Sequence, residues 1–463
     1  MGGGFLLLAF LDSRNLTIKL TPDGFSPAEV TIKTGETVTF YNFTKTPFWP
    51  ASNEHPSHSI YSEFDSKKPI ATGETWSFQF NKPGVWKYHD HLSPFFTGFV
   101  IVEGQAAQDA TAIDYCAIQK DSSDCWRQEL DTVFTSKGIE PTFDLLESHY
   151  QKYPLFADSC HNLAHELGHQ SVNKYLEDPD SIFSPKAAYC AYGFYHGFME
   201  SLINARGIVA AKNFCREVGA RLGESTPDAF LQCYHGVGHG GIALTAGEHA
   251  DYTEDGLTQA ALEFCELASD AADQLYRCAS GVFNTVGSFY IRNEFGLRVR
   301  PEDPLWFCHI QPDKYKDSCY GNLNLALNWA ADNDFSKSSK FVEKIPEQKY
   351  AASAMIYLAA SNSLQVAKND PEAAVFACRN LKNQLNLPCI EGFVYGFLEN
   401  GSPNFAYREA MAFCDTKSMT EDEREKCFDY SLSPLDAIYS IDKARQICAE
   451  EAPLRYKKYC EHI

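Results

Sequence analysis

Hydrophobic and polar residues alternate along the first hundred residues of the chain. Six short segments are rich in β-branched and aromatic residues, and apolar side chains occupy every second position in four of them, residues 16–20, 29–32, 37–40 and 75–80; the other two are residues 84–88 and 98–102. Turn-forming sequences such as Pro22-Asp23-Gly24 and Lys82-Pro83-Gly84 separate these segments. A period of two is typical of half-buried strands. The pattern therefore predicts a β-sandwich or barrel over residues 12–104.

A helical pattern begins near residue 116. Ala, Leu, Glu and Lys become more frequent, and runs such as 260–264 and 350–360 carry apolar residues at helical spacing. Residues 105–115 are small and polar, as expected for a linker. The apolar run Phe5–Phe10 is too short to span a membrane. We expect residues 1–11 to be the end of a signal peptide, a membrane anchor or a tag.

All 16 cysteines follow residue 115, and twelve of them form six closely spaced pairs. The opening cysteines at 308, 378, 414 and 448 fit a repeat of about 35 residues with one unit skipped. In the skipped unit Glu343 and Ala354 replace both cysteines together, as expected if the members of each pair are bonded to each other. The pairs are Cys215/Cys233, Cys265/Cys278, Cys308/Cys319, Cys378/Cys389, Cys414/Cys427 and Cys448/Cys460.

The repeat predicts a disulfide-stapled α-helical repeat (solenoid) domain over residues 116–463. Its unit length resembles that of tetratricopeptide and Sel1-type helical hairpins, although no full signature of those repeats is present. Four cysteines fit the repeat less well, and their three possible pairings stay open. These are Cys116, Cys125, Cys160 and Cys190.

The net charge and the number of cysteines indicate the cellular compartment of the protein and exclude some classes of partner. The chain has 463 residues and a net charge of −21, which argues against nucleic acid and anionic membranes as partners. Sixteen cysteines without a Cys-x-x-Cys pair do not fit zinc fingers or iron–sulfur ligation. We expect disulfides and an extracytoplasmic location, whether secreted, periplasmic or cell-surface. The alternative is a cytosolic protein with reduced, buried thiols.

Three stretches of the β region resemble a cupredoxin domain. They are Phe25–Val38, Pro69–Phe78 and the strand that leads into Tyr88-His89-Asp90-His91. The resemblance implies a Greek-key β-sandwich, followed by the helical domain in a multidomain β + α protein. It does not extend to the blue-copper site, because residues 12–104 contain no Cys and Phe48 stands at the position of the first His ligand. A thiolate-ligated copper is therefore excluded.

Histidines remain as copper ligands in this region. Trp86–His91 resembles the Trp-Tyr-His-x-His segment of multicopper oxidases, and alternate residues at a strand end point the same way. His89 and His91 are therefore expected to share a copper ion, together with His55 or His58 from the preceding insertion. The alternative is that this domain has lost its metal. Oxidase activity is not expected, because one such domain lacks the Cys-centred electron-entry site.

Histidine and glutamate also recur on three of the predicted helices. Pairs spaced four residues apart lie on one helix face, and if these helices are neighbours, the side chains converge on one inner surface. This composition predicts a zinc or copper site, whereas the alternative is a set of buried hydrogen bonds between helices. The pairs are His165 and His169, His196 and Glu200, and His235 and His239.

One of these pairs belongs to a zincin-like stretch. His165-Glu166-Leu167-Gly168-His169 matches His-Glu-x-x-His, in which the two His bind zinc and the Glu is the general base. His196 or Glu200 is the candidate third ligand. The metzincin continuation is absent, since Val172 and Tyr175 replace the Gly and His that it requires.

The sequence therefore favours an extracytoplasmic metal-binding protein that handles copper. The first alternative is a zinc-dependent hydrolase or protease with Glu166 as its base. The second is a solenoid that binds a protein partner on its concave face and holds no metal.

Overall fold

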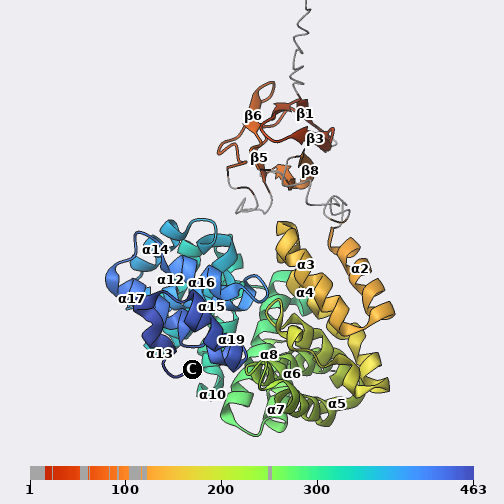
Figure 1. Ribbon diagram of the computed structural model, residues 1–463, viewed down its shortest axis with the longest axis vertical. Helices are drawn as coiled ribbons and strands as arrows, with labels where there is room; N and C mark the ends of the chain where they lie inside the picture. Colours follow the sequence, from red (N-terminus) through yellow and green to blue (C-terminus); the bar gives the residue numbers. More distant parts are fainter. Residues whose placement is uncertain are drawn as a thin grey trace, which may run out of the picture. The chain divides into compact units, whose positions relative to one another are not determined.

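The computed structural model describes residues 16–22, 24–52, 61, 63–82, 84–90, 93–103, 116, 122–248 and 253–463 (Figure 1). The chain divides into two compact units, residues 1–122 and 123–463. The first is a β-sandwich and the second is α-helical. Among the described residues, no helix is both long enough and apolar enough to span a bilayer.

The sandwich consists of two four-stranded sheets. The first has the order β2-β1-β4-β6, with β1 Leu16–Thr21, β2 Gly24–Ser26, β4 Thr37–Asn42 and β6 Thr75–Gln79. The second has the order β3-β8-β7-β5, with β3 Glu29–Lys33, β5 Pro50–Ser52, β7 Gly84–Asp90 and β8 Ser93–Glu103. The pairs β1–β4 and β3–β8 are parallel, and the other pairs are antiparallel. The predicted β-sandwich is confirmed. The three-residue strands β2 and β5 are too short to show a period and were not predicted.

An aromatic core lies between the two sheets. Phe64 is fully buried and stacks on Trp76 and Phe78, with ring centroids 5.8 and 5.1 Å away. Phe80 and Tyr88 approach the same ring edge-on, at 4.8 and 5.7 Å. Aromatic side chains bury large areas in such pairs, so this cluster is the main source of the sandwich's stability.

The second unit is built from helices of very different length. The long ones are α2 Ser122–Lys137, α3 Ile139–Lys152, α4 Pro154–Glu177, α5 Gly193–Leu222, α6 Ala229–Glu248, α7 Glu254–Ala268, α8 Ala272–Arg292, α10 Asp313–Asn322, α13 Gln348–Ser361, α15 Asn386–Asn400 and α17 Glu421–Leu432. The short ones are α9 Trp306–His309, α11 Asn324–Ala330, α12 Phe335–Val342, α14 Pro371–Arg379, α16 Ala406–Cys414, α18 Leu435–Ile438 and α19 Ile441–Gln446.

Disulfides join neighbouring helices throughout this unit. All six pairs predicted from spacing are present, and Cys160 bonds to Cys190. Cys116 and Cys125 are disulfide-bonded as well, which brings the total to eight. The predicted helical fold and its bonding scheme are thus confirmed.

Successive long helices pack side by side, in the order α4, α5, α6, α8, α10, α13, α15 and α17. The chain also returns on itself, because the loop after α15 meets α3. Tyr150 Oη donates to the carbonyl oxygen of Asn400 (2.5 Å), and the Asn404 side chain donates to Glu147 and Tyr189 (both 2.8 Å). The solenoid architecture itself stays a prediction. Helices α4, α5, α6 and α8 carry the polar residues described below.

Candidate metal centre

Glycines allow helices α4, α5 and α6 to pack in close contact. A Cβ atom at Gly197 of α5 would overlap the carbonyl oxygen of His165 on α4, and one at Gly168 would overlap that of Phe194. At Gly236 of α6 a Cβ would lie 2.5 Å from the carbonyl oxygen of Tyr195. Only glycine permits such backbone approaches. The predicted ligand pairs on these three helices therefore face one another at short range.

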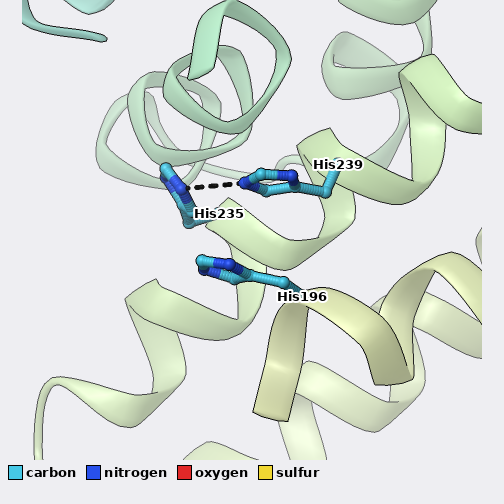
Figure 2. Close-up of side chains that lie close together, drawn as sticks. All are labelled: His196, His235 and His239. Carbon is cyan, nitrogen blue, oxygen red and sulfur yellow. Dashed lines mark hydrogen bonds between the residues drawn. The ribbon is translucent and has the colours of Figure 1, made fainter. Parts of the chain in front are cut away.

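His196, His235 and His239 form the first cluster (Figure 2). One ring nitrogen from each lies within 4.8 Å of the others. The Nε2 atoms of His235 and His239 face each other at 3.2 Å, and the His196 ring stacks on His239 with centroids 4.3 Å apart. His196 and His239 are buried. We call this group the histidine triad.

His165, His169 and Glu200 form the second cluster, with ligand atoms again within 4.8 Å of one another. The Nε2 atoms of the two His lie 3.4 Å from the two carboxylate oxygens of Glu200. Glu200 Oε1 also lies 3.9 Å from Nδ1 of His239, so this carboxylate lies between the two clusters. All six residues that the sequence placed on these helices are therefore brought together.

Two hydroxyl groups on α8 hydrogen-bond to imidazoles of the triad. Ser280 Oγ donates to the carbonyl oxygen of Arg277 (2.7 Å), and Thr285 Oγ1 donates to that of Gly281 (3.0 Å). Each hydroxyl then accepts a hydrogen bond from an imidazole, Ser280 from Nδ1 of His235 (2.7 Å) and Thr285 from Nδ1 of His239 (3.0 Å). When Nδ1 carries the proton in both rings, both facing Nε2 atoms present lone pairs, whereas with the other tautomer in one ring the same contact is the hydrogen bond drawn in Figure 2.

Burial keeps the triad neutral. It lowers the pKa of His239 to about 3; the nearby Glu200 acts in the opposite direction, and His165 and His161 lower the pKa further. The pKa values of His196 and His235 are lowered well below the usual value, chiefly by burial and then by the adjacent His239. Neutral imidazoles are the form that binds metal ions.

Glu200 is the ionised member of the second cluster. Its burial alone would raise the pKa, but the hydrogen bond from His165 and the nearby His239 and His169 lower it. A carboxylate and two imidazoles are a donor set suited to zinc or copper.

The sequence analysis missed three residues that complete this region. His161 precedes His165 by four residues on α4, and its ring lies 5.0 Å from that of His196. This spacing was visible in the sequence. Ser280 and Thr285 had no such signal, because they lie on α8, more than forty residues from their partners.

Glu166 does not join either cluster. It is exposed on α4, whereas His165 and His169 are half-buried. The edge strand that zincins use to hold substrate is also absent, since the described strands all lie within residues 16–103.

The β-sandwich offers fewer described ligands. His89 on β7 is 1% exposed and pairs in register with Ala51 and Thr97. Phe48, at the position of the first copper ligand, is fully buried beside Phe25. His55, His58 and His91 lie outside the described residues. Both groups of three potential ligands found in the described part of the chain are in the helical unit.

Comparisons with known proteins concern the sandwich. A purple cupredoxin from Nitrosopumilus maritimus is 27% identical, matching 19% of this chain and 100% of its own length with a TM-score of 0.18. Amicyanin from Paracoccus versutus is 25% identical over 20% of this chain and 87% of its own, also with a TM-score of 0.18. A mutant of amicyanin in its Cu(I) state is 23% identical over 19% of this chain and 82% of its own, with a TM-score of 0.17. No family model and no curated protein sequence matches the chain.

Proposed function

We propose that this protein binds transition-metal ions outside the cytoplasm and that its helical unit holds them between α4, α5 and α6. His196, His235 and His239 would hold one zinc or copper ion. His165, His169 and Glu200 would hold a second. The bound ion supplies a Lewis-acidic or redox-active centre, and the protein side chains keep it in a defined, partly buried position.

The facing lone pairs of His235 and His239 carry this proposal. Two neutral imidazole nitrogens without a proton between them repel each other at 3.2 Å, and a cation between them turns the repulsion into two bonds. In tetrahedral zinc sites with Zn–N distances of 2.0–2.1 Å, two ligand nitrogens lie about 3.3 Å apart. The observed separation therefore suits a bound ion.

The hydroxyl partners support the same interpretation. Metal-binding imidazoles usually donate their second ring proton to a neighbouring oxygen, which orients the ring. Ser280 and Thr285 do this for His235 and His239, and Ser201 lies 2.8 Å from Nδ1 of His169. The alternative from the sequence, a set of buried hydrogen bonds between helices, makes the Nε2 contact a hydrogen bond and requires the proton of one ring to be on Nε2.

Copper binding in the sandwich is a separate part of the proposal. It rests on His89 and His91, with His55 or His58, and on the resemblance of this segment to copper-binding sequences. The eight disulfides support an oxidising, extracytoplasmic compartment for the whole chain.

A titration of the full-length, metal-free protein tests the helical site. We expect Zn²⁺ or Cu²⁺ to bind with an affinity that falls at least a hundredfold in the double variant His235→Ala, His239→Ala. His309→Ala is the matched control, because this histidine is 43% exposed and pairs with Asp303 away from the clusters. Binding that is equal in all three proteins would refute the helical site. If the double variant His89→Ala, His91→Ala binds one copper equivalent fewer than the wild type, the sandwich site lies at these residues.

A hydrolase remains the second candidate, because Glu200 meets both histidines of the His-Glu-x-x-His stretch as a third ligand would. In that case Glu166→Gln abolishes peptide cleavage and leaves the metal content unchanged. Cleavage that survives this substitution, or no cleavage by the wild-type protein, rules out the hydrolase.

A further inference from the structure

Arg277 is a largely buried arginine whose guanidinium has no hydrogen-bond partner among the described residues. Its side chain is 19% exposed, and its closest charged neighbour is Asp228, with Nη2 and Oδ1 3.7 Å apart. That distance exceeds a hydrogen bond. Asp228 instead accepts a hydrogen bond from Gln232 (2.7 Å). An arginine carries five N–H donors, and no nitrogen of Arg277 is among the fully buried unpaired atoms of the described residues, so these donors face accessible space in the adjoining cavities.

The guanidinium lies where two cavities of the helical unit meet. One cavity has a volume of about 200 Å³ and the other about 980 Å³. Arg277, Tyr357 and Tyr395 line both of them. The unpaired donors can therefore be reached by a small molecule that enters through the larger cavity.

The smaller cavity is lined almost entirely by polar side chains. Amide groups from Gln232, Asn284 and Asn324 contribute to its wall, as do His196 and His235 of the triad. Amides donate and accept hydrogen bonds, so this cavity suits a small hydrophilic molecule.

The position of Arg277 is well defined. It lies within α8, its carbonyl oxygen accepts the Ser280 hydroxyl, and the next residue, Cys278, is bonded to Cys265. The carboxyl groups near Arg277 belong mainly to the larger cavity, which Asp228, Asp313, Asp317, Glu391 and Asp429 line, whereas Glu399 is the acidic residue of the smaller one. Glu399 lines the smaller cavity and accepts a hydrogen bond from Tyr395. Burial is the largest of several influences on Glu399, and its pKa is raised to about 7. Asp228 is the nearest counter-charge, and among its described lining residues the smaller cavity has no acidic residue other than Glu399.

We propose that the smaller cavity binds a small organic molecule bearing a carboxylate, which pairs with the Arg277 guanidinium through two parallel hydrogen bonds. The planar fork of arginine matches a carboxylate in this way, whereas lysine offers only a point charge. The site goes beyond metal binding and does not depend on it. Because His196 and His235 line the same cavity, the ligand would share this space with the metal centre.

Calorimetry on the full-length protein tests the site, with malonate as the probe and with metal-free and zinc-loaded samples. We expect malonate to bind both samples, about tenfold or more weakly in Arg277→Met and with an intermediate affinity in Arg277→Lys. Arg292→Met is the matched control, since Arg292 is 59% exposed and pairs with Glu294. Circular dichroism and a free-thiol count check that each variant is folded.

A second variant keeps the test decisive if Arg277→Met does not fold. Asn284→Leu removes an amide from the smaller cavity without changing Arg277, and we expect it to weaken malonate as well. Inorganic phosphate and putrescine are the competing probes. Preference for phosphate over malonate, preference for putrescine, or equal malonate binding by the wild type, Arg277→Lys and Asn284→Leu would each overturn the carboxylate site. Because malonate is tested without metal, this outcome is independent of the zinc titration.

Discussion

Both units of this protein bury apolar side chains, and they differ in the polar groups and covalent links that accompany this burial. Between its sheets the sandwich holds an apolar, largely aromatic cluster around Phe64, and none of its residues in 12–104 is a cysteine. Beside its apolar core the helical unit holds the imidazoles of the triad, the half-buried carboxyl of Glu399 and the guanidinium of Arg277, and disulfides join its helices.

This difference shows how a polar interior is maintained. Apolar burial stabilises the sandwich by itself, at about 25 cal/mol per Å². Buried polar groups give little net stability, and the helical unit has covalent links and close helix contacts in addition to its own apolar burial. We infer that the polar groups inside the helical unit reduce its free energy of unfolding and are present because they are chemically active.

Reduction of the disulfides should produce the largest difference in thermal stability between the two units. Each disulfide that closes a loop of 11–18 residues contributes about 3 kcal/mol in the chain-entropy model. With a phosphine reductant we expect the helical thermal transition to disappear and the sandwich transition to stay in place. Calorimetry with and without reductant measures both. Equal shifts of the two transitions would contradict the comparison.

A cavity in the aromatic core should have the reverse effect. Phe64→Ala removes the ring around which the core is packed, and we expect the sandwich to lose about 3–5 kcal/mol of unfolding free energy. The helical transition should not change. Phe43→Ala is the control, since Phe43 is 62% exposed. If both substitutions have the same effect, the core is not where the sandwich gains its stability.

The half-buried carboxyl of Glu399 should make the helical unit less stable as the pH rises from about 4.5 to about 7. In the unfolded chain this group ionises near pH 4.5, but in the folded protein its pKa is about 7. The folded state therefore binds the extra proton between these values, and stability falls as pH rises through this window.

We expect Glu399→Gln to be about 3 kcal/mol more stable than the wild type at pH 8 and to differ little at pH 4.5. Denaturant unfolding at the two pH values measures the difference. The exposed Glu302 provides a control, Glu302→Gln, that should leave the pH dependence unchanged. A Glu399→Gln protein with wild-type pH dependence would show that this carboxyl ionises normally.

Two glycine substitutions give the smallest effects. Gly197→Ala forces α4 and α5 apart, and we expect a loss of about 2–3 kcal/mol together with weaker metal binding. In the sandwich, Gly73 has φ +81° with open space around it, so Gly73→Ala should cost only about 1 kcal/mol through backbone strain. It should leave metal binding intact. Thermal unfolding and zinc titration compare them, and an unaffected Gly197→Ala protein would remove the close-packing argument.

The sequence predicted a good part of this structure from local spacing. A period of two located the main strands, and the cysteine repeat gave six of the disulfides correctly. Pairs four residues apart identified the potential ligands on α4, α5 and α6. The pairing of Cys160 with Cys190 could not be chosen, because four irregular cysteines carry no repeat to decide among three schemes.

The amino-acid sequence by itself determined which residues share a face of one helix or strand. This depends only on the period of the regular backbone. Tertiary structure alone decided which faces meet. His235 and His239 hydrogen-bond to hydroxyl groups from α8, and the unpaired state of Arg277 depends on groups as distant as Tyr357 and Tyr395. These hydrogen bonds and buried contacts join elements that are far apart in the chain, so no local sequence pattern predicts them.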